Sequence, residues 1–126
     1  MAKQVIYSAN APESIGPYSQ AIRNGHMLFI SGQIAIRKPE GTMITGSIEE
    51  ETEQVMQNLK SILEAAGMDF SHVVKSTIFL KDMNHFPVVN EVYGKYFPNN
   101  PPARETVEVS RLPKDANVEI SCIAIG

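Results

Sequence analysis

The chain has 126 residues, of which 43% are hydrophobic and 20% charged, and these values count against a disordered chain and favour one globular domain over residues 1–126. A formal net charge of −3 and a pI near 5.6 count against nucleic acid as a main partner. The sequence shows neither a signal peptide nor the ~18 apolar residues of a membrane helix, and its one cysteine, Cys122, excludes an intrachain disulfide, so we expect a cytoplasmic protein.

The first third of the chain is predicted to form short strands joined by turns. The extended candidates are residues 5–7, 19–23 and 27–36. Before the third of these, Asn24-Gly25 is a strong hairpin signal, because both residue types tolerate the positive φ that tight hairpin turns need. We therefore expect a hairpin at this pair.

A long amphipathic helix is predicted next, and both of its ends are marked. Ser47 and Glu50 form a capping-box pattern, the acidic first turn suits the positive end of the helix dipole, and Gly67 suits the left-handed residue that follows a helix. The apolar residues of this helix recur at three- and four-residue spacing and are Ile48, Val55, Met56, Leu59, Ile62, Leu63 and Ala66.

A strand with apolar residues on both faces is predicted at residues 73–80, which are rich in β-branched side chains. Alternation places Val74 and Ile78 on one face, and Val73 and Phe79 on the other. We expect both faces of this strand to be covered.

The last part of the chain is predicted to hold a second helix at residues 84–97, with Asn84 as its N-cap and Pro87 in its first turn, and strands at residues 106–109 and 117–125. The element order is ββ(β)αβαββ. Two helices can cover only one face of a sheet of five or six strands, yet the strands carry apolar residues on both faces. We therefore predict an obligate oligomer.

Most common signatures of catalytic sites are absent from the sequence. It contains no GxGxxG, Walker, CxxC or GxSxG motif. The histidines, His26, His72 and His85, lie at unrelated spacings, so we expect no metal site and interpret them as solvated turn residues.

Two positions in the first third of the chain are candidates for a binding site. Gly16-Pro17 fixes a turn that delivers Tyr18, whose alternative role is a packing residue with a satisfied hydroxyl. Ser31-Gly32 interrupts an apolar strand, which indicates either a β-bulge or the close approach of another group.

Two charged residues in the last third are further candidates. Arg104 follows a proline-stiffened loop directly before a strand expected to be buried, and a guanidinium held in this way suits a planar carboxylate; the alternative is a surface ion pair. Glu119 lies inside a hydrophobic strand. In a cleft its pKa would rise into the range useful for acid–base catalysis, whereas facing solvent it would be the polar half of an alternating strand.

Together these positions resemble the reactive-intermediate deaminase family, also called RidA or YjgF. The likeness extends over essentially the whole chain. The matching segments are Asn10-Ala11-Pro12, Gly16-Pro17-Tyr18-Ser19-Gln20-Ala21, Ser31-Gly32-Gln33-Ile34, Lys81-Asp82-Met83-Asn84, Val89-Asn90-Glu91-Val92-Tyr93, Pro102-Ala103-Arg104, Val107-Glu108-Val109-Ser110-Arg111-Leu112-Pro113-Lys114-Asp115 and Val118-Glu119-Ile120.

The resemblance implies a chorismate-mutase-like α/β (α+β) fold: a mixed sheet of about six strands with two helices on one face, assembled as a homotrimer with sites in clefts between subunits. It also implies hydrolysis of reactive 2-imino acids, such as 2-aminoacrylate and 2-iminobutyrate, to 2-keto acids and ammonia. No cofactor and no covalent nucleophile are expected.

By position, the resemblance implies that Arg104 binds the substrate carboxylate and that Glu119 assists the attacking water or the departing amine. It implies a substrate-binding role for five further residues, which are Tyr18, Ser31, Phe86, Asn90 and Thr106.

Two departures from the family pattern concern the pocket. Many members carry Ser-Cys where this chain has Glu105-Thr106, and a second glutamate where it has Ser121, so substrate range could differ. Cys122 is interpreted as a core residue. The alternative functions are a non-catalytic trimer that binds a 2-keto acid and regulates a partner, and an RNA-directed inhibitor of translation, against which the acidic pI counts.

Overall fold

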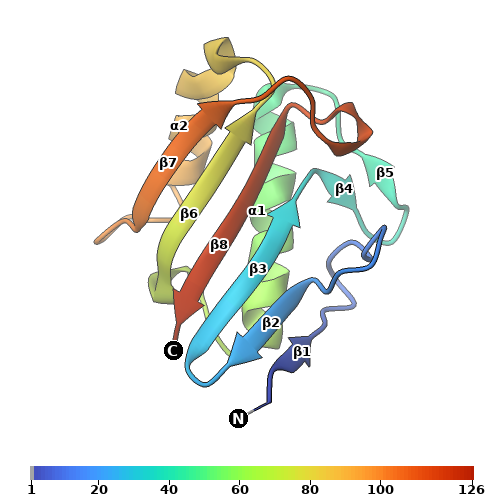
Figure 1. Ribbon diagram of the computed structural model, residues 1–126. Helices are drawn as coiled ribbons and strands as arrows, with labels where there is room; N and C mark the ends of the chain where they lie inside the picture. Colours follow the sequence, from blue (N-terminus) through green and yellow to red (C-terminus); the bar gives the residue numbers. More distant parts are fainter. Residues whose placement is uncertain (1) are drawn as a thin grey trace.

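The computed structural model describes residues 2–126, which form a six-stranded mixed sheet and two α-helices (Figure 1). The strands lie in the order β1-β2-β3-β8-β6-β7, and each neighbouring pair is antiparallel except β6 and β7. The elements are β1 (Gln4–Ile6), β2 (Ala21–Asn24), β3 (Met27–Gln33), β4 (Ile36–Arg37), β5 (Thr42–Met43), α1 (Ile48–Ala65), β6 (Val73–Leu80), α2 (Phe86–Gly94), β7 (Ala103–Glu108) and β8 (Val118–Ile125).

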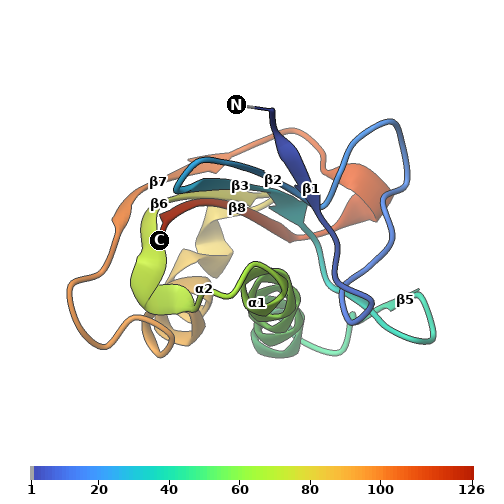
Figure 2. The same ribbon diagram turned by 90° about the horizontal axis from the view of Figure 1, so that it is seen from below.

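Both helices lie on the same face of the sheet, as Figure 2 shows, and the core fills the space between the two layers. The residues with the largest fully buried side chains include Leu28, Met56, Leu59, Ile62, Leu63, Ile78, Leu80 and Ile120. Burying a side chain of this size stabilises a fold by roughly 1.5–3 kcal/mol. No helix among residues 2–126 is long and apolar enough to cross a membrane.

The first helix agrees closely with the prediction. The Ser47 hydroxyl accepts a hydrogen bond from the Glu50 backbone N–H at 3.1 Å, which caps α1. Ala66 is the C-cap, and Gly67 follows it with a φ of +73°. The predicted hairpin is also confirmed, but its two-residue turn is Gly25-His26, because Asn24 is the last residue of β2 and lies opposite Met27.

The second helix differs from the prediction at both ends. Asp82, rather than Asn84, caps a short 3₁₀ turn by accepting from the Asn84 backbone N–H at 2.9 Å. The α-helix begins only at Phe86 and ends at Gly94. Asp82 and Asn84 are both good caps, so residue type alone does not choose between them.

Three strand predictions are corrected by the structure. Residues 27–36 are not one strand, since β3 ends at Gln33 and β4 begins at Ile36. The final crossover strand, β7, begins at Ala103 and is an exposed edge strand rather than a buried one. In β6 a register shift between Val73 and Lys75 turns Val73 into the core and leaves Val74 exposed, which reverses the predicted faces.

The sheet face away from the helices is open (Figure 2). One row of aligned residues on this face runs across four strands and consists of Val5, Ile22, Phe29 and Ile123. Val5 is 60% exposed and Phe29 is 42% exposed. The cover that the sequence predicts for this face is therefore not supplied by the helices.

Candidate active site

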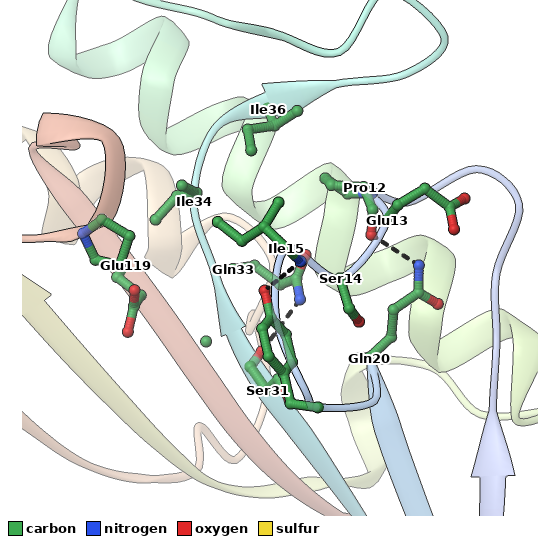
Figure 3. Close-up of a pocket in the computed structure, with 13 residues that line it drawn as sticks. Pro12, Glu13, Ser14, Ile15, Gln20, Ser31, Gln33, Ile34, Ile36 and Glu119 are labelled. Carbon is green, nitrogen blue, oxygen red and sulfur yellow. Dashed lines mark hydrogen bonds between the residues drawn. The ribbon is translucent and has the colours of Figure 1, made fainter.

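The side chain of Glu119 borders a hollow of about 360 Å³, a size within the usual range for small-molecule sites. We call it the glutamate hollow. Figure 3 shows Glu119 on one side of it, with Ser14 and Ile15 of the loop before β2 on the other. The lining residues are Pro12, Glu13, Ser14, Ile15, Tyr18, Gln20, Ser31, Gly32, Gln33, Ile34, Ile36, Pro113 and Glu119.

The floor of the glutamate hollow depends on the absence of a side chain at Gly32. The register between β3 and β8 shifts between Ile30 and Gln33, so the sequence signal at Ser31-Gly32 does mark an irregular strand. A Cβ added at Gly32 would lie 2.5 Å from Oε2 of Glu119. Both alternatives predicted for Ser31-Gly32 are therefore found. Gly32 lies where the strand register shifts, and its lack of a side chain lets the Glu119 carboxylate approach the backbone.

Glu119 is half-buried, and desolvation raises the pKa of its carboxyl group above the usual value. No ion pair involves this carboxylate among residues 2–126. A desolvated carboxyl group without a cationic partner exchanges a proton nearer to neutral pH than an exposed one.

A buried glutamine fixes the loop that forms the outer wall of the glutamate hollow. The side-chain amide of Gln20 donates to the carbonyl oxygens of Ser8 and Pro12, at 3.1 and 2.8 Å, and its oxygen accepts from the Ser8 N–H at 2.7 Å. The Ser31 hydroxyl donates to the Ser19 carbonyl at 2.6 Å. Ser31 thus ties the loop to β3, and it also lines the glutamate hollow.

Tyr18 lines this hollow. Its side chain is 48% exposed, and its hydroxyl accepts a weak hydrogen bond from the Ile15 N–H at 3.3 Å. Tyr18 is therefore not part of the core, although its hydroxyl is satisfied as the packing alternative expects. A partly exposed phenol at a hollow is available to a ligand or to another protein surface.

Arg104 borders a second hollow, which we call the arginine hollow and which shares no lining residue with the first. Its Nη1 donates to Oδ1 of Asn90 at 2.8 Å. No carboxylate lies within ion-pair distance of Arg104 among residues 2–126, so the surface ion pair expected as the alternative is not formed. The lining residues are Asn90, Tyr93, Gly94, Phe97, Pro101, Pro102 and Arg104.

Two aromatic rings of α2 contact the same guanidinium. Its central carbon lies 5.6 Å from the ring centroid of Phe86 and 5.1 Å from that of Tyr93.

Thr106 follows Arg104 on β7, with its hydroxyl buried and without a hydrogen-bond partner among residues 2–126, but it lines neither hollow. Tyr93 and Gln20 also line the two hollows, although neither is predicted as a site residue from the sequence.

The two charged candidates lie on opposite faces of the sheet. Arg104 is aligned with Ser76, which is buried on the helix side, whereas Glu119 is aligned with Phe79 on the open side. Strand spacing and register separate their Cα atoms by roughly 14 Å. Within one chain, the structure does not bring these two side chains together.

Known proteins resemble this chain over nearly its whole length. A family model described as "Endoribonuclease L-PSP" matches residues 8–126. The human protein named 2-iminobutanoate/2-iminopropanoate deaminase is 45% identical over 99% of this chain and 91% of its own length. A conserved Rid family protein from Yersinia pestis superposes with a TM-score of 0.96 at 47% identity, covering 99% of this chain and all of the other.

A third relative was solved with an amino acid in place. The structure of TdcF from E. coli with bound serine superposes with a TM-score of 0.93 at 36% identity, covering 98% of both chains. The resemblance inferred from the sequence and the α+β fold are thereby confirmed. The chain belongs to the L-PSP family, which is the family of the YjgF and RidA proteins.

Proposed function

We propose that this protein is an enamine/imine deaminase, which hydrolyses small 2-imino acids to 2-keto acids and ammonia in the cytoplasm. The name of the human relative supports the reaction, and the serine bound to TdcF supports a small ligand with a carboxylate. The observation that carries the proposal is the guanidinium of Arg104, which borders a hollow and has no acidic partner among residues 2–126.

The proposed reaction asks for orientation and a placed water, because the carbon of a protonated imine is already a strong electrophile. Arg104 binds the carboxylate through charge-assisted hydrogen bonds. The water oxygen then bonds to C2, and Glu119 takes a proton from the water and returns one to the nitrogen. The C2–N bond then breaks with its electron pair leaving on ammonia, and the C2 hydroxyl gives its proton to the Glu119 carboxylate as the carbonyl group of the 2-keto acid forms.

We propose further that the working site combines the arginine hollow of one protomer with the glutamate hollow of the next in a homotrimer. Arg104 and Glu119 belong to different hollows and point to opposite faces of the sheet, so one ligand touches both only if two protomers meet. In this arrangement the arginine side includes Asn90, Phe86 and Thr106. The glutamate side includes Tyr18 and Ser31.

The direct test generates 2-iminobutyrate in situ from threonine with a pyridoxal-phosphate dehydratase and follows ammonia and 2-oxobutanoate. Wild-type protein is expected to accelerate hydrolysis above the spontaneous rate, and Arg104→Ala is expected to lose that acceleration. Arg111→Ala is the matched control, because Arg111 is exposed and lines neither hollow. Full activity of Arg104→Ala, with its oligomeric state unchanged, would refute the assigned role.

The same assay separates catalysis from the regulatory alternative. A trimer that only binds 2-keto acids would give a dissociation constant for 2-oxobutanoate in calorimetry but no ammonia above the spontaneous rate. That pair of results would replace the enzyme proposal with a ligand sensor.

A further inference from the structure

The α2 surface beside Arg104 holds three side chains in contact with its guanidinium. Phe86, Asn90 and Tyr93 are spaced four and three residues apart, so they occupy one stripe of the helix. Asn90 accepts one hydrogen bond from Nη1, and the two rings lie near the cationic carbon.

All three neighbours of the guanidinium are uncharged groups. An arginine held by a carboxylate would have its charge balanced before a ligand arrived, whereas amide and aromatic contacts restrain the side chain and leave the positive charge available. Burial raises the pKa of the Tyr93 phenol, so this group stays neutral under ordinary conditions.

Tyr93 contributes through its ring rather than its hydroxyl. The residue is 4% exposed, and its hydroxyl has no hydrogen-bond partner among residues 2–126. The ring is itself fixed, because it packs on Phe97 with the two centroids 4.7 Å apart. Such a buried platform restricts the directions that a long, flexible arginine side chain can take.

We propose that Tyr93 and Phe86 are positioning residues, whose rings restrain the Arg104 guanidinium while Asn90 occupies one of its nitrogens, so that the remaining N–H groups face a carboxylate. This inference rests on the proposed function for the identity of the ligand. The restraint itself is a property of the protein without ligand, and it can be measured separately.

The first measurement is binding of 2-oxobutanoate by calorimetry to the full-length protein. Tyr93→Leu is expected to weaken binding roughly tenfold, because the ring beneath the cation is lost. Tyr93→Phe keeps the ring and is expected to bind like wild type. Tyr96→Leu is the matched control, since it removes an aromatic ring from the same region that does not contact Arg104 and does not line the arginine hollow.

The second measurement needs no ligand. The Nε–H resonance of Arg104, identified by its loss in Arg104→Ala, is expected to show a ring-current shift in wild type and Tyr93→Phe, and to move toward the random-coil position in Tyr93→Leu. Phe86→Leu is expected to shift it as well, and this partly exposed position serves if the Tyr93→Leu chain fails to fold.

The outcomes distinguish the two proposals. Unchanged binding and an unchanged Arg104 resonance in folded Tyr93→Leu or Phe86→Leu would overturn the positioning role. A resonance that responds to both substitutions, in a protein that neither binds 2-oxobutanoate nor releases ammonia, would keep the restraint and reject the proposed function.

Discussion

Burial of the Glu119 carboxyl group makes the stability of the folded chain depend on pH. Its pKa is raised in the folded protein by desolvation, whereas in the unfolded chain it returns to about 4.3. Below that value the group is protonated in both states and burial adds no penalty. As pH rises through the folded pKa, ionisation destabilises the native state.

Replacing Glu119 with glutamine removes this titration while keeping the shape of the side chain. The difference in free energy of unfolding, Glu119→Gln minus wild type, is expected to become more positive as pH rises above about 4, because ionisation of the desolvated carboxyl group destabilises only the wild type. Urea unfolding at several pH values measures it, with Glu40→Gln in an exposed loop as the control. A difference that does not vary with pH, or that falls, would contradict the buried environment assigned to Glu119.

One buried glutamate joins α1 to the start of β8. Glu51 is 1% exposed, and its carboxylate accepts from the backbone N–H of Asn117 at 2.7 Å and from the side-chain amide at 2.9 Å. Asn117 directly precedes β8, the strand that carries Glu119. This contact therefore holds the strand end that positions the catalytic candidate.

Glu51→Ala is expected to lower the free energy of unfolding by about 1–3 kcal/mol, because the Asn117 donors lose their acceptor in a buried place. Denaturant titration provides the measurement. Glu49→Ala, an exposed change in the same helical turn, is expected to cost less than about 1 kcal/mol. Equal losses in the two variants would show that the buried contact adds nothing.

The sequence predicts the elements well where the signals are local. Spacing of apolar residues, the Ser47 cap and Gly67 define α1 almost to the residue, because each depends on neighbours within one helical turn. The exchanged faces of Val73 and Val74 were not predictable, since a bulge arises from pairing with a partner strand.

Candidate site residues could be named from the sequence, but their arrangement could not. Family resemblance supplied Arg104 and Glu119 without showing that they lie on opposite faces of the sheet, which depends on the register of three strands. Tyr93 is one of several buried residues of the second helix, and nothing in its local sequence distinguishes it from a core residue. Its contact with Arg104 exists only because the crossover brings β7 beside that helix.

The open sheet face exposes apolar side chains that no element of the same chain covers among residues 2–126. The row of Val5, Ile22, Phe29 and Ile123 crosses four strands, and a contiguous apolar surface of this kind is typical of an interface. Two further large apolar residues, Met27 and Ile125, are aligned beside the row and are 39% and 46% exposed. A second copy of the chain is the partner that the proposed composite site requires.

Wild-type protein is expected to sediment as a homotrimer of about 42 kDa, three times the 13.9 kDa chain. Phe29→Glu places a charge in the centre of the apolar row, and its burial in an interface without a partner is costly, so this variant is expected to dissociate. Gln57→Glu adds the same charge on the exposed side of α1 and is expected to leave the trimer intact. Analytical ultracentrifugation distinguishes these species. A wild-type monomer with full deaminase activity would contradict both the interface and the shared site, because Arg104 and Glu119 of one chain face away from each other.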